Sequence, residues 1–168
     1  MEHDLEAPSF GEIATQYAQD VVDGKLLACK WTRLACERHL RDIARAAAAA
    51  ENQIPLSPPL IKGEENHGEE KGAWPYRFNP ELTDVDGKLY RPAERVCRFA
   101  ELMPHVDGDW AARRELIHLE PWQVFILASI FGWVHAVTGK RRFRVADLFV
   151  PRKNAKSTLG AVIGLYML

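Results

Sequence analysis

The sequence predicts an α/β fold that is mainly helical and reaches one strand–loop–helix unit near its C-terminal end. Apolar residues recur at helical spacing over much of the chain. One short apolar segment is followed by a basic turn and then a second apolar stretch, which is the order of a strand, a loop and a helix. The chain has 168 residues, of which 47% are hydrophobic and 27% charged, as in ordinary globular proteins.

Charge and cysteine content exclude several classes of protein. The 22 basic and 23 acidic residues give a net charge of -1, which excludes a polycation that coats nucleic acid but leaves a local basic patch possible. No apolar run approaches the ~18 residues that a membrane span needs, and the acidic N-terminus lacks the apolar part of a secretory signal. We therefore expect a cytoplasmic protein without membrane contact. Cys29, Cys36 and Cys97 have irregular spacing, which favours reduced and mostly buried thiols over a zinc site.

Residues 1–50 predict an N-terminal helical region. Ser9 and Glu12 have the spacing of a capping box, so a helix is expected over residues 10–22, with Gly24 ending it. A second helix is expected from about Cys29 into a run of alanines. One side of that helix carries Arg33, Glu37, Arg38, Arg41 and Arg45. We interpret that side as facing solvent, and contact with phosphate is the alternative.

Composition changes over residues 51–75, which are rich in Pro, Gly and Glu and predict a disordered insertion without chemistry. Residues 76–117 predict a linker region that is partly helical and partly irregular. Pro92 suits the first turn of a third helix, which Pro104 ends. In the irregular connection that follows, Trp110 is predicted to be a packing anchor.

Residues 118–168 predict a helix followed by the strand–loop–helix unit. Pro121 opens a fourth helix, whose buried face includes Trp133, and Gly139 ends that region. A strand is predicted over residues 143–150. An apolar helix is predicted over residues 159–168, and because it is apolar on nearly every side we expect it to be covered on most sides.

The turn between the predicted strand and the last helix resembles a phosphate-binding loop. Such a loop reads G-x-x-x-x-G-K-[ST], and its lysine and hydroxyl serve the phosphates and Mg²⁺. Lys156 and Ser157 occupy these two positions, whereas Val150 and Ala155 stand where the glycines would be. If the second position requires a positive φ, alanine costs roughly 1–2 kcal/mol there. The alternative is a basic turn before an ordinary buried helix.

The wider pattern resembles the large terminase subunit of tailed bacteriophages, the ATP-driven motor that packages DNA. The elements that carry the resemblance are Leu119-Glu120-Pro121-Trp122-Gln123 followed by the segment Phe143 to Thr158. Similar upstream segments are Tyr17 to Gly24, Ala35 to Leu40, Arg95 to Phe99 and Leu102 to His105. The resemblance implies a P-loop NTPase fold, with the terminase ATPase domain beginning in residues 118–168.

The resemblance also implies roles for individual residues. Gln123 would hydrogen-bond the adenine edge, and Pro121 and Trp122 would set the start of that helix and pack near the base. Lys156 and Arg152 would act on the β- and γ-phosphates, and Ser157 would ligate Mg²⁺. The complete set implied to bind ATP is Pro121, Trp122, Gln123, Arg152, Lys153, Asn154, Ala155, Lys156, Ser157 and Thr158. Without the resemblance, Gln123 is a solvent-facing helix residue and Trp122 packs in the core.

The family's partners are double-stranded DNA, a small terminase subunit, a portal protein and further copies in a ring, in the bacterial host cytoplasm. The arginines of the second helix and the basic run 140–144 are the segments we expect to meet DNA phosphates. The family's catalytic acids and nuclease domain lie further downstream, so we expect an N-terminal fragment without ATPase or endonuclease turnover of its own. The alternatives are an inactive prophage remnant, a partner-binding helical module with a disabled nucleotide site, and an unrelated helical DNA-binding module.

Overall fold

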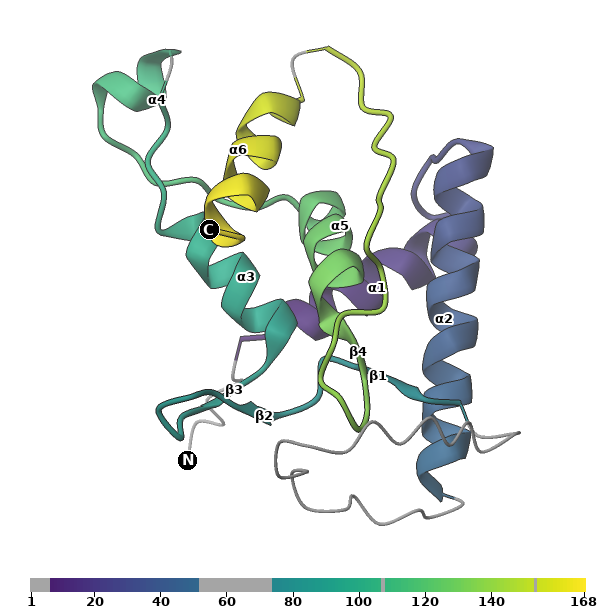
Figure 1. The fold of residues 1–168 in the computed structure, drawn as a ribbon. Helices are drawn as coiled ribbons and strands as arrows, with labels where there is room; N and C mark the ends of the chain where they lie inside the picture. The colour runs from purple at the N-terminus through teal and green to yellow at the C-terminus, as the bar shows by residue number, and fades with distance from the viewer. Residues whose placement is uncertain (1–6, 52–73, 107, 153) are drawn as a thin grey trace, which may run out of the picture.

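The computed structural model describes residues 7–51, 74–106, 108–152 and 154–168. Its helices are α1 (Phe10–Val22), α2 (Lys30–Glu51), α3 (Pro92–Glu101), α4 (Gly108–Ala112), α5 (Pro121–Gly132) and α6 (Lys156–Tyr166). Short antiparallel strands pair as β1 (Tyr76–Phe78) with β4 (Trp133–His135) and as β2 (Leu82–Thr83) with β3 (Leu89–Tyr90) (Figure 1). Within the described ranges, no helix has both the length and the apolar character that crossing a membrane requires.

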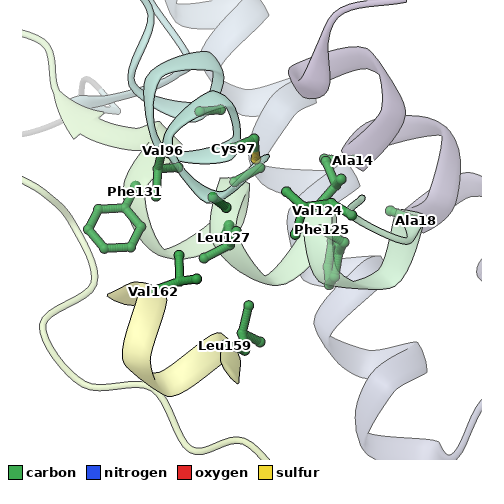
Figure 2. Packing of buried hydrophobic residues seen from close by; sticks show 14 of the residues in the cluster. Ala14, Ala18, Val96, Cys97, Val124, Phe125, Leu127, Phe131, Leu159 and Val162 are labelled. Atoms are coloured by element: carbon green, nitrogen blue, oxygen red, sulfur yellow. The ribbon is translucent and has the colours of Figure 1, made fainter. Parts of the chain in front are cut away.

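Helix α5 is the centre of the core. It packs against α1 and α3, and α1 in turn packs against α2. Figure 2 shows that Val124 and Leu127 of α5 lie among small or medium side chains of these neighbours. Those neighbours include Ala14 and Ala18 of α1 and Val96 and Cys97 of α3, all of them fully buried. Because α5 is apolar nearly all round, it is stable only where other helices enclose it.

Several local predictions are confirmed. The Ser9 hydroxyl accepts a hydrogen bond from the Glu12 backbone N–H at 3.2 Å, and the Ser9 N–H donates to the Glu12 carboxylate at 2.8 Å, which completes the predicted capping box. Gly24 has a φ of 77° just after α1 and ends it as expected. Cys36 and Cys97 are buried, Cys29 is exposed, and all are free thiols, as predicted.

The end of α5 differs from the prediction. The helix stops at Gly132, and Trp133 begins β4 instead of continuing the helical face. In the pairing with β1, Phe78 lies opposite Trp133 and Tyr76 opposite His135. A Cβ on Gly132 would lie only 2.9 Å from the Phe78 ring, so the missing side chain is what lets β1 approach the end of the helix.

The predicted strand over residues 143–150 is wrong. This segment forms no strand and runs as a long extended trace between β4 and α6 (Figure 1). Val145 is 80% and Phe149 94% exposed, and every residue from 144 to 149 is exposed, so neither face of the segment is covered. An apolar sequence adopts strand geometry only when a second strand satisfies its N–H and C=O groups, and no described residue pairs with 143–150.

Two smaller predictions also fail. Trp110 is 55% exposed on the short helix α4, and among the described residues its ring stacks only with His105, so it is no core anchor. The last helix begins at Lys156, earlier than expected, and is covered on one side, with Leu159 buried and Leu165 49% exposed. The predicted disordered insertion lies, for residues 52–73, outside the described residues. Glu51 is the last residue of α2.

Candidate nucleotide site

The start of α6 has an unusual backbone. Ala155, the residue before the helix, has φ 47° and ψ 26°, in the left-handed region, and no side chain caps the first turn. Residues at this position normally have extended dihedrals. A left-handed residue followed by right-handed helical ones turns successive backbone N–H groups toward one point, and such a concavity binds anions. Ala155 thus has the conformation that a glycine would adopt without strain, at a cost of about 1–2 kcal/mol.

The loop before this helix folds back on itself. The Asn154 side-chain amide donates to the carbonyl oxygens of Pro151 and Arg152, at 3.4 and 3.3 Å. Both distances are long for hydrogen bonds, so the loop is only weakly held. Lys153 lies outside the described residues. The Leu159 N–H donates to the Ala155 carbonyl at 2.9 Å, so the helical ladder begins at Ala155 itself.

The predicted phosphate ligands surround this turn and face solvent. Arg152, Lys156 and Ser157 are exposed, and Thr158 is half-buried. Neither Arg152 nor Lys156 forms an ion pair with a carboxylate in the described part of the chain. Their charges are therefore available to an anionic ligand that enters the turn.

Helix α6 is held in place by its other side. Leu159 and Val162 point toward Leu127 of α5 (Figure 2), and both are buried. Near the end of the helix the Tyr166 ring lies 5.4 Å from that of Phe99 and 5.0 Å from that of Phe131. The helix is thus fixed along its length while its first turn stays open.

The start of α5 is organised differently. Pro121 is exposed, Trp122 is half-buried, and Gln123 is only 8% exposed. The Gln123 side-chain oxygen accepts a hydrogen bond from the Glu120 backbone N–H at 2.9 Å. Gln123 is therefore not the solvent-facing helix residue expected without the resemblance. Its side-chain amide also already has a hydrogen-bond partner within the chain.

The structure does not join the two predicted parts of the site. Among the described residues, no hydrogen bond, ion pair or ring contact links 121–123 to 150–158. Each group lies at the N-terminus of its own helix, α5 or α6. The residues predicted to bind the phosphates, 150–158, and those predicted to bind the base, 121–123, therefore have no contact of these kinds in the described chain.

Comparison with protein families gives one match. The family described as terminase large subunit, ATPase domain, matches residues 121–168, a little over a quarter of the chain. Over these residues the chain is similar to the ATPase domain of the terminase large subunit. No curated protein and no solved structure matches the chain. The matched terminase segment begins at the first residue of α5 and includes α6, so it contains both helix starts described above.

The match indicates a coarse function and fold class for residues 121–168. An ATPase domain implies nucleotide binding, and the observed mixture of helices and small sheets fits the P-loop NTPase class. The P-loop strand of that class is not formed by residues 143–150. The roles of Arg152, Lys156, Ser157 and Gln123 remain predictions.

Sequence reasoning missed a buried ion pair in this chain. The Arg142 guanidinium donates to the Asp42 carboxylate of α2 at 2.6 Å, and the two side chains are 18% and 3% exposed. Four aromatic rings lie within 4.7–5.6 Å of the guanidinium, those of Trp74, Tyr76, Trp133 and Phe143. The Arg142 side chain is therefore paired within the fold. Of the basic run 140–144 predicted to meet DNA, this arginine is not available for DNA phosphates. Its partner lies too far away in sequence for a local pattern to reveal it.

Proposed function

We propose that the turn at residues 150–158 binds the triphosphate of ATP, with Mg²⁺, as part of a terminase-type motor. The observation that carries this proposal is the left-handed Ala155 directly before an exposed Lys156-Ser157 at the start of α6. Converging N–H groups, an ammonium group and a hydroxyl are what a nucleotide triphosphate requires. In this proposal Lys156 neutralises charge on the β- and γ-phosphates, and Arg152 binds the γ-phosphate through its planar guanidinium.

In this proposal Mg²⁺ is held mainly by the phosphates and by water, with one oxygen from the protein. Among the described residues, no group of three or more His, Cys, Asp or Glu side chains could hold a metal ion. Mg²⁺ in nucleotide sites keeps several waters and takes its other ligands from phosphates and from one or two protein oxygens. The exposed Ser157 hydroxyl supplies such an oxygen next to Lys156.

The wider role proposed is that of the terminase family. The motor would use ATP to move double-stranded DNA into a procapsid, with a small terminase subunit, a portal protein and further copies of the large subunit as partners. Endonuclease cleavage of that DNA belongs to the same proposal. The match to the ATPase domain and the open start of α6 support the ATP-driven part of this role.

Calorimetric titration of ATP with Mg²⁺ into the full chain tests the site. Lys156→Ala should weaken binding by about 10- to 100-fold, because a charge-assisted hydrogen bond contributes about 1.5–3 kcal/mol. Lys88→Ala is the matched control, since Lys88 is an exposed lysine in the β2–β3 turn, outside the matched terminase segment. Ser157→Ala should reduce the gain in affinity that Mg²⁺ gives. An absence of heat at millimolar nucleotide would favour the partner-binding module with a disabled site.

A further inference from the structure

The outer face of α2 carries a continuous stripe of exposed side chains. In chain order the stripe consists of Leu27, Trp31, Leu34, Arg38, Arg41 and Arg45. From Trp31 to Arg45 the spacing alternates between three and four residues, which places these five side chains on one side of α2. Leu27 lies in the non-helical segment three residues before the helix. The first half of this stripe is apolar and the second half is basic. We call it the α2 stripe.

The apolar half is uncovered. Leu27 is 106%, Trp31 73% and Leu34 42% exposed. The Trp31 ring has a cation–π contact with the neighbouring Lys30, whose ammonium lies 5.6 Å from the ring. Adjacent exposed Trp and Leu side chains are uncommon on a surface that stays in water, and tryptophan is the residue most often found at the energetic centre of protein interfaces.

The basic half keeps an excess of positive charge. Arg45 lies 3.5 Å from Asp42, but the other oxygen of that carboxylate already binds Arg142, so two arginines share one acid. Arg38 lies over the Phe143 ring at 4.9 Å, which fixes its stem and leaves its charge unpaired by any described carboxylate. Arg41 is exposed and likewise forms no ion pair with a described carboxylate.

We propose that the α2 stripe docks an acidic amphipathic helix of a partner protein. A helix lying antiparallel to α2 would place acidic residues of its first half against Arg38, Arg41 and Arg45, and leucines of its second half against Trp31 and its neighbours. Acidic residues in a first turn also stabilise the partner's own helix. Paired amphipathic helices recognise each other through anchors at this spacing.

Two other occupants fit less well. A nucleic acid backbone would use the arginines, but Leu27, Trp31 and Leu34 offer nothing to phosphates. A second copy of this chain would bring arginines against arginines wherever the basic halves meet, and like charges repel. A partner that is apolar in one half and acidic in the other satisfies both halves of the α2 stripe. The proposal is independent of nucleotide binding, because none of the stripe residues lies in residues 150–158.

The test is calorimetric titration of a synthetic helical peptide into the full chain. The probe carries glutamates on one face of its first half and leucines on the same face of its second half, and a second peptide has lysine at each glutamate position. We expect the acidic peptide to bind with micromolar affinity that falls as salt is raised. Trp31→Ala and Arg41→Glu should each weaken binding by about tenfold or more, which is typical of an interface hot spot.

Matched variants and a DNA titration make the test decisive. Trp110→Ala removes an exposed tryptophan from α4 and Arg98→Glu reverses an exposed charge on α3, and both should leave binding unchanged. Circular dichroism confirms that each variant keeps its helices. Equal binding of the lysine peptide, or binding insensitive to Trp31→Ala, would overturn the proposal. It would also be overturned if a DNA duplex bound and lost affinity with Arg41→Glu but not with Trp31→Ala.

Discussion

The two helix starts in the terminase segment show two different solutions to one problem. The first N–H groups of any helix lack partners within it. At α5 the chain supplies structure of its own, with Pro121 in the first turn and the Gln123 oxygen on the Glu120 N–H. At α6 no side chain caps the turn, and Ala155 is left-handed. A start closed by its own side chains serves the fold, whereas an open, strained start is suited to a ligand.

The largest expected effect is on the free energy of unfolding, because α5 is buried and α6 is partly exposed. Leu127 of α5 is fully buried, so Leu127→Ala should lower the free energy of unfolding by about 3 kcal/mol, through lost transfer energy and a cavity. Leu165→Ala in α6 should cost less than about 1 kcal/mol, because Leu165 is 49% exposed. Urea unfolding monitored by circular dichroism measures both. Equal losses would show that α6 is covered as fully as α5.

The pH dependence of stability tests how α5 is anchored by His39. Burial lowers the pKa of His39 to about 4, and its ring packs against Phe125 of α5 and accepts a hydrogen bond from the Trp133 indole N–H at 3.3 Å. The unfolded chain protonates this histidine near pH 6.5, so stability should fall as pH drops from about 6.5 to about 4, by up to about 3 kcal/mol.

Variants at two histidines isolate that effect. Thermal unfolding of the His39→Phe variant across the same pH range should show a flatter slope, because the titrating ring is gone. His118→Asn replaces a histidine outside this cluster, 91% exposed and 3.4 Å from the Glu101 carboxylate, and serves as the comparison variant. A slope that His39→Phe leaves intact would assign the pH dependence to other groups.

A substitution at Ala155 tests the strain at the open start of α6. Ala155→Gly should raise the free energy of unfolding by about 1 kcal/mol, because glycine adopts a positive φ without the Cβ clash, less its greater unfolded-state entropy. Ala161→Gly in the interior of the same helix should instead lower it by about 1 kcal/mol. Thermal unfolding measures both. If both glycines destabilise, the left-handed conformation is not the ground state of residue 155.

The smallest effect concerns base selection at the closed start of α5. The Gln123 oxygen accepts from the Glu120 N–H, so the amide N–H groups are the part of this side chain without a described partner, and both adenine and guanine accept at N7. We therefore expect ATP and GTP to bind within about threefold of each other, because one neutral hydrogen bond contributes about 0.5–1.5 kcal/mol. Competition titrations measure the ratio. A preference for ATP above about tenfold would mean that Gln123 leaves its cap when nucleotide binds.

Sequence reasoning succeeded where a structure depends on neighbouring residues. The capping box of Ser9 and Glu12 and the prolines that open α3 and α5 act within one turn, so their patterns predicted those helices. It failed where a partner is distant. The segment 143–150 looks like a strand by composition but has no described partner, while β4 pairs with a β1 that lies more than fifty residues earlier.

By itself the sequence determined that helices begin at residues 10, 92 and 121 and which residues stand beside the turn before α6, because capping and helical spacing are local interactions. Tertiary structure alone decided that Arg142 is held by Asp42 rather than exposed, that residues 143–150 form no strand, and that the α2 stripe stays uncovered. Each of these depends on which distant surfaces meet when the chain packs, and local residue preferences carry no information about that.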